Sequence, residues 1–74
     1  MKKNIRAFPV SVIVPMRNSS TTVLRTLKSI RSQRYPIQQI IVVDNASTDD
    51  SVSKVLQYKK KANRIKIRLI LERI

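Results

Sequence analysis

Three short apolar runs, separated by two stretches of helical spacing, limit the folds that this chain can adopt. The runs VSVIV (10–14) and IIVV (40–43) are β-branched and nearly continuous, which is typical of parallel strands covered on both faces. The run IKIRLIL (65–71) begins by alternating with Lys66 and Arg68, and this one-sided exposure favours an edge strand. The sequence therefore predicts three strands.

The first stretch of helical spacing follows the first strand. Its apolar side chains fall at i, i+1, i+4 and i+7, which is one helix face, and basic residues occupy the other side. These apolar residues are Val23, Leu24, Leu27 and Ile30. Ser19 or Ser20 is expected to cap the helix, and Pro36 prevents its continuation.

A second helix is predicted from about Asp49 to Lys61, where three lysines in the last turn suit the negative end of the helix dipole. Ser47 with Asp50 has the spacing of a capping box, so both are expected to cap this helix. The side chains expected to point inward are Val52, Val55 and Leu56.

The order strand-helix-strand-helix-strand predicts an α/β fold. It corresponds to one half of a doubly wound, Rossmann-like sheet, with parallel strands in the order 3-2-1 and right-handed crossovers. This half-sheet is incomplete, because the first strand keeps a free edge where a fourth strand, a second copy or a missing chain could pair. Residues 1–9 are expected to form a basic N-terminal extension, and residues 10–74 a single domain portion.

Composition excludes several kinds of site. With no Cys and no His among 74 residues, disulfides, thiolate metal sites and His-based acid–base catalysis are excluded, and zinc is disfavoured. With no Gly, neither the dinucleotide fingerprint G-x-G-x-x-G nor a P-loop can form. A nucleotide site in this chain must therefore rely on side chains.

The charge is strongly basic, with 16 Lys and Arg against four Asp and Glu, a net +12. This predicts attraction to polyanions, including phosphates, nucleic acid and, peripherally, an anionic membrane face. No apolar run approaches the ~20 residues that cross a bilayer, so we expect a soluble, cytoplasmic protein.

The carboxyl ends of the first two strands should lie side by side, because these strands pair. Ligands of open α/β sheets bind beyond such ends. The segments there are PMRNSS and DNASTDD. Asp44 follows the last apolar residue of the second strand, at the rim of the expected crevice. Its carboxylate either closes an Asx turn or accepts hydrogen bonds from a ligand, such as a base N–H or a ribose hydroxyl.

Three neighbours of Asp44 are weaker candidates. Arg17 and Asn18 come after Pro15 at the end of the first strand, and Arg17 is either a solvated charge or a contact to phosphate or base. Pro15 is expected to end that strand, because it lacks the donor N–H. Asn45 is an ordinary turn residue that could also face a ligand.

The motifs at these strand ends match a known pattern. The segments VSVIVPMRN (10–18) and LRTLKSIRSQRYPIQQIIVVDNASTDDS (24–51), with the third run, fit an apolar strand, P-x-[YR]-N, a helix ending S-[IL]-x-x-Q-x-[YF]-P, and a strand closing on V-D-[DN]-[GA]-S-x-D. The chain thus resembles the N-terminal segment of family 2 inverting glycosyltransferases, GT-A-fold enzymes that use nucleotide-diphosphate sugars.

This resemblance implies roles for individual residues. Asp44 matches the family aspartate that reads the nucleobase, usually uracil, and Pro15 and Arg17 match positions that line the base and ribose. Asn18 and Asn45 lie in the same motifs, and Ala46 stands where Gly is more common. The implied function is transfer of a sugar from a UDP-type donor to a glycan, lipid or protein.

The rest of the family's site does not match residues of this chain. Mg²⁺ or Mn²⁺ is expected only if a further segment supplies the family's D-x-D carboxylates, and no residue here matches the catalytic base. The only spare carboxylate, Glu72, is expected on or after an edge strand, far from the crevice. We therefore expect no metal and no catalytic residue within this chain, and no sugar transfer by it alone.

The alternative is a non-catalytic, basic binding module for nucleotide, nucleic acid or a partner chain. The +12 charge favours this alternative, whereas one Phe and two Tyr offer little for stacking on single strands.

Overall fold

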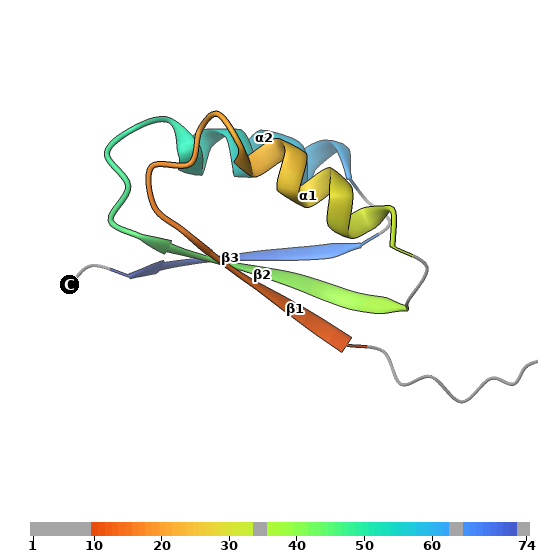
Figure 1. Cartoon of the computed structure of the whole chain (residues 1–74). Helices are drawn as coiled ribbons and strands as arrows, with labels where there is room; N and C mark the ends of the chain where they lie inside the picture. Colours follow the sequence, from red (N-terminus) through yellow and green to blue (C-terminus); the bar gives the residue numbers. More distant parts are fainter. Residues whose placement is uncertain (1–9, 34–35, 63–64, 73–74) are drawn as a thin grey trace, which may run out of the picture.

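The computed structural model describes residues 10–33, 36–62 and 65–72 and contains three strands and two helices (Figure 1). The predicted order is confirmed, and the observed ends of the strands and of the second helix lie within three residues of their predictions. The extension predicted for residues 1–9 lies outside the described residues. The elements are β1 (Val10–Met16), α1 (Val23–Arg31), β2 (Ile37–Asn45), α2 (Ser51–Lys61) and β3 (Lys66–Glu72).

The strands form one parallel sheet in the order β1-β2-β3, which is the predicted order 3-2-1. Val14 of β1 lies opposite Val42 of β2, which in turn lies opposite Leu69 of β3. The two helices lie side by side over the same face of the sheet (Figure 1). The predicted α/β half-sheet is therefore confirmed, with β2 in the centre.

The core lies between the helices and the face of the sheet that they cover. Leu27 of α1 and Val55 of α2 are fully buried against side chains of the sheet, because strand residues at alternate positions share this face. Leu56, predicted to point inward, is 45% exposed, so that prediction is wrong; the buried face of α2 is narrower than the sequence suggested. The buried apolar residues are Met16, Val23, Leu27, Ile40, Val42, Val55, Ala62 and Ile67.

The opposite face of the sheet carries no helix from the described residues (Figure 1). The prediction that the strands are covered on both faces is therefore wrong for the described part of the chain. On this face Pro15, Val43 and Ile70 lie opposite one another in the register. Ile70 is 39% exposed, and Ile13, which lies opposite Ile41, is 64% exposed. A band of apolar side chains thus crosses all three strands on the open face.

Pro15 lies inside β1, which continues to Met16, so the prediction that Pro15 ends the strand is wrong. Within the described residues β1 pairs only with β2, and an edge strand tolerates proline because one of its sides makes no ladder hydrogen bonds. The predicted free edge of β1 is thus observed in the described part of the chain.

Among the described residues, no helix is long and apolar enough to cross a membrane.

Candidate functional site

Hydrogen bonds join the loop after β1 to the loop after β2, as expected for neighbouring parallel strand ends. Asn18 makes most of them: its Oδ1 accepts from the backbone N–H groups of Thr48 (2.7 Å) and Asp49 (3.3 Å). Its own N–H donates to the Ser47 hydroxyl (2.8 Å). The predicted juxtaposition of the two segments is therefore confirmed.

Asn18 and Ala46 both adopt left-handed backbone conformations, with φ of 47° and 53°. Asn tolerates the left-handed region well. In this conformation the Asn18 side chain also reaches the backbone of the second loop. The Ala46 side chain can make no hydrogen bond that would offset the strain, and its Cβ crowds the backbone in this conformation. The left-handed conformation is a physical reason for Gly to be more common at this position in the family.

The serines after Asn18 connect the first loop to the start of α2. The Ser19 N–H donates to the Ser51 hydroxyl (2.8 Å), and the Ser20 N–H donates to Asp49 Oδ2 (3.2 Å). Helix α1 begins one residue after Thr22 and has no side-chain cap, so the prediction that Ser19 or Ser20 caps it is wrong. The N–H groups of these serines instead fix the first loop against the second.

The capping box predicted for α2 is also absent. Ser47 is hydrogen-bonded to Asp44, and Asp50, which immediately precedes the helix, makes no side-chain cap bond. Asp49 takes over part of this function, because its Oδ1 accepts from the N–H (2.9 Å) and the hydroxyl of Ser51. These bonds lower the pKa of Asp49 from 3.8 to about 2, with the Ser51 hydroxyl contributing most.

Asp44 is the buried carboxylate of the site, with only 3% of its surface exposed. Its Oδ1 accepts from the Ser47 hydroxyl (2.5 Å) and its Oδ2 from the Ser47 N–H (3.2 Å), which is the Asx-turn geometry considered for the sequence. A carboxylate offers about four acceptor positions, so these two bonds leave about half of its capacity for a ligand.

A cavity of about 130 Å³ lies at Asp44, at the carboxyl ends of β2 and β3. It is smaller than the ~300–1,000 Å³ typical of whole small-molecule sites, so it has room for only part of such a molecule. The residues that line it are Asp44, Ala46, Ser47, Val52, Leu71 and Glu72.

Glu72 was predicted to lie far from the crevice, and the structure shows the opposite. Glu72 lies opposite Asn45 in the register and lines the same cavity as Asp44. The signal was in the sequence, because the ends of all parallel strands meet at one edge of the sheet. Leu71, Val52 and Ser47 were likewise not recognised as cavity residues.

The other predicted site residues do not line this cavity. Pro15 is exposed, and the alternation of β1 places it on the face opposite to Met16, which is paired with Asp44. Arg17 and Asn45 are both exposed, and Arg17 donates from Nη1 to the carbonyl of Asn45 (3.4 Å). Their contacts with a nucleotide stay predictions. Within the described ranges, no group of three or more metal-ligating side chains comes together.

The comparison with known proteins identifies the class of protein that this fold and site represent. The family described as "Glycosyl transferase family 2" matches residues 11–73, so the chain belongs to this family. No solved structure matches the chain significantly.

Individual relatives show the same relationship. The chain is 35% identical over 66 residues to a poly(ribitol-phosphate) beta-glucosyltransferase from Bacillus spizizenii, covering 86% of this chain and 10% of that protein. It is 40% identical over 57 residues to GalNAc(5)-diNAcBac-PP-undecaprenol beta-1,3-glucosyltransferase from Campylobacter jejuni, covering 77% and 18%. It is 32% identical over 59 residues to a hyaluronan synthase from Streptococcus pyogenes, covering 77% and 14%. The chain thus spans less than a fifth of the length of each of these relatives.

Replacing Ala46 with glycine should stabilise the protein. Removing Cβ from a left-handed residue relieves about 1–2 kcal/mol, and the greater freedom of glycine in the unfolded chain offsets about 0.4–1 kcal/mol of this. We expect a net gain of about 0.5–1 kcal/mol in the free energy of unfolding, measured with urea. Ala62→Gly is the control, because Ala62 has φ of −92° and is buried, so it should lose stability. A loss of stability in Ala46→Gly would contradict the strain at Ala46.

Because of Asp49, the free energy of unfolding should depend on pH in the acid range. Its pKa is lowered on folding, so its contribution is fully present above the unfolded value near 3.8 and is lost as the pH falls towards 2. Asp49→Asn should flatten the decline of the urea midpoint between about pH 4 and pH 2. Asp50→Asn makes the same charge change at the adjacent position, and an equal flattening there would contradict the role of Asp49.

Proposed function

We propose that this chain provides the nucleotide-binding part of a family 2 glycosyltransferase, in which Asp44 accepts a hydrogen bond from the base of a nucleotide-diphosphate sugar. The observation that carries the proposal is a buried carboxylate with spare acceptor capacity, lining a cavity at the carboxyl edge of a parallel sheet. The family match over residues 11–73 supports the same placement.

The donor in this proposal is of the UDP type. Uracil presents a ring N–H between two carbonyl groups, and a carboxylate can accept from that N–H. Neutral cytosine presents a bare ring nitrogen at the same place, which would face the carboxylate with two acceptors and no proton between them. Asp44 would therefore favour UDP over CDP.

The neighbouring loop residues complete the proposed nucleotide site. Arg17 lies beside Asn45 at the loop surface, where its guanidinium could swing towards a ribose or a diphosphate. Asn18 keeps the two loops together, so its contribution to nucleotide binding would come through the position of the loops as well as through contact. Pro15 is proposed, from the family pattern, to border the base and ribose.

The transferred sugar would go to a glycan, lipid or protein acceptor. The names of the relatives include acceptors of different chemistry, among them poly(ribitol-phosphate) and GalNAc(5)-diNAcBac-PP-undecaprenol. Transfer needs a metal or an equivalent charge against the diphosphate and a general base for the acceptor hydroxyl. Mg²⁺ or Mn²⁺ and this base would be supplied with residues beyond these 74.

Replacing Asp44 with asparagine should weaken UDP binding to the full chain by about 10–100-fold, because a hydrogen bond to a charged group contributes about 1.5–3 kcal/mol. Calorimetric titration at fixed ionic strength measures the loss, and CDP should bind more weakly than UDP to the unsubstituted protein. Asp50→Asn has the same net charge as Asp44→Asn and should bind UDP normally. Circular dichroism checks that each variant is folded.

One outcome of this titration, and one of a separate transfer assay, would contradict the proposal. Equal losses in both variants would show that UDP responds to net charge alone, as expected for the alternative basic binding module, and added salt would then abolish binding. Release of sugar onto an acceptor from a UDP-sugar, by the purified chain with Mn²⁺, would show that a catalytic group lies within these residues.

The free edge of β1 is proposed to take up a further strand, from a second copy or from additional chain. Unpaired N–H and C=O groups beside an apolar strand favour such pairing. Light scattering of the purified chain should therefore show a mass that rises with concentration. A constant monomer mass together with slow amide exchange throughout β1 would contradict an unpaired edge.

A further inference from the structure

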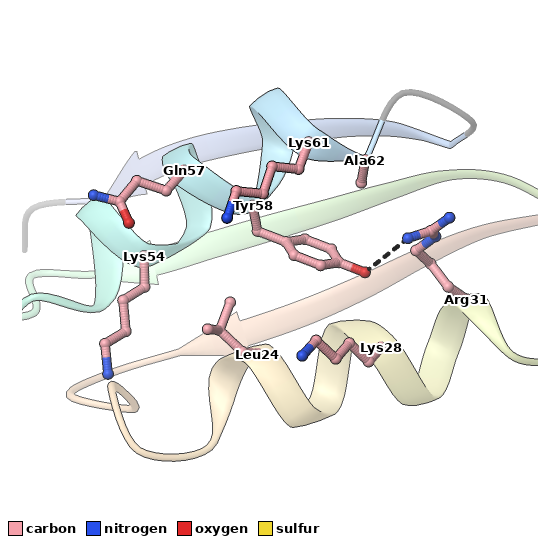
Figure 2. Close-up of a pocket in the computed structure, with 8 residues that line it drawn as sticks. All are labelled: Leu24, Lys28, Arg31, Lys54, Gln57, Tyr58, Lys61 and Ala62. Carbon is pink, nitrogen blue, oxygen red and sulfur yellow. Dashed lines mark hydrogen bonds between the residues drawn. The ribbon is translucent and has the colours of Figure 1, made fainter.

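A second cavity, of about 220 Å³, lies between the two helices and shares no residue with the cavity at Asp44. Helix α1 contributes one wall and helix α2, with the residue that follows it, contributes the other (Figure 2). The lining residues are Leu24, Lys28, Arg31, Lys54, Gln57, Tyr58, Lys61 and Ala62. We refer to it as the interhelical groove.

The floor of the interhelical groove is apolar. Leu24 and Tyr58 pack against the hydrophobic core, and Ala62 is only 5% exposed. Charges held over such a surface are less screened than charges surrounded by water, so a ligand of opposite charge is attracted more strongly there.

Four of the eight lining residues are cations, and none is a carboxylate. Lys28 reaches in from α1 and Lys61 from α2, on either side of the Tyr58 ring (Figure 2). Arg31 is held at one end, because its Nη1 donates to the Tyr58 hydroxyl (3.2 Å). Lys54 stands at the other end and donates from Nζ to the Ser20 carbonyl (2.8 Å). Like charges gathered in one groove repel one another, and a bound anion would remove this repulsion.

We propose that the interhelical groove binds a phosphate or diphosphate group. Lys28 and Lys61 approach such a group from opposite sides, and Arg31 offers further N–H donors in a planar fork that matches phosphate oxygens. The volume lies below the ~300–1,000 Å³ of sites for whole small molecules, so it suits a head group. A free diphosphate and the head group of an anionic lipid carry this same chemistry.

Titration of the full chain with inorganic pyrophosphate, at fixed ionic strength and followed by amide chemical shifts, tests the proposal. The amides of Leu24 and Ala62 should shift saturably, and the midpoint of thermal unfolding should rise more than in chloride of equal ionic strength. Asp44→Asn should leave these shifts unchanged, which separates this site from the proposed UDP site.

Matched charge variants distinguish binding at the interhelical groove from attraction to the net positive charge of the protein. The double variant Lys28→Gln/Lys61→Gln removes two groove cations and should weaken pyrophosphate binding by about tenfold or more. The control Arg25→Gln/Lys60→Gln removes the same charge from exposed positions on the same helices that do not line the groove, so it should bind normally. Circular dichroism confirms folding of both. Equal losses in the two variants, or no saturable shift at Leu24 and Ala62, would overturn the proposal.

Co-sedimentation with lipid vesicles identifies the source of the phosphate group. Vesicles of phosphatidylglycerol should retain the protein through the groove cations, whereas vesicles of phosphatidylcholine should not. Binding to the vesicles that is lost in Lys28→Gln/Lys61→Gln and kept in the control would assign the groove to a lipid head group. Binding of pyrophosphate alone, with the same dependence on these lysines, would assign it to a free anion. Vesicle binding that both variants retain would overturn the assignment to lipid.

Discussion

The hydrogen bonds made by Asn18 across the two loops determine the shape of the candidate site. One carboxamide oxygen accepts from two successive backbone N–H groups of the second loop, and the Asn18 N–H donates to Ser47. Ser47 in turn donates to Asp44 through its hydroxyl and its N–H. A single residue just after β1 therefore positions the carboxylate at the end of β2, since its side chain holds the second loop and its backbone N–H holds Ser47.

Much of the fold could be predicted because the relevant signals are local. The β-branched runs and the spacing of Val23, Leu27 and Val55 reflect the repeat of each element, and the order of elements leaves few topologies for a parallel sheet. Whether helices cover one face of the sheet or both could not be predicted in the same way. A run such as IIVV has the same apolar pattern whether helices cover one face of its sheet or both. Only residues elsewhere in the chain determine what packs on each face.

The site was predictable to a lesser degree. Asp44 was recognisable from its place at a strand end, whereas the hydrogen-bond partners of the serines and acids around it were not. Ser47 and Asp50 have the spacing of a capping box, yet the nearby Asp44 and Asn18 engage Ser47 first. Such competition between local and long-range partners depends on which loops meet in space. Glu72 differs, because the alternation of the third strand indicates only how exposed the strand is, whereas the position of its carboxyl end places Glu72 at the cavity.

The open face of the sheet has a thermodynamic consequence. Unfolding raises the heat capacity in proportion to the apolar surface that becomes newly hydrated, and denaturants act in proportion to the newly exposed area. Side chains such as Ile13 are already largely in contact with water in the folded chain, so unfolding adds little there. The stability of the isolated chain would accordingly vary with temperature along a flatter curve than that of a domain of equal length with both sheet faces covered, and covering the open face would make that curve steeper.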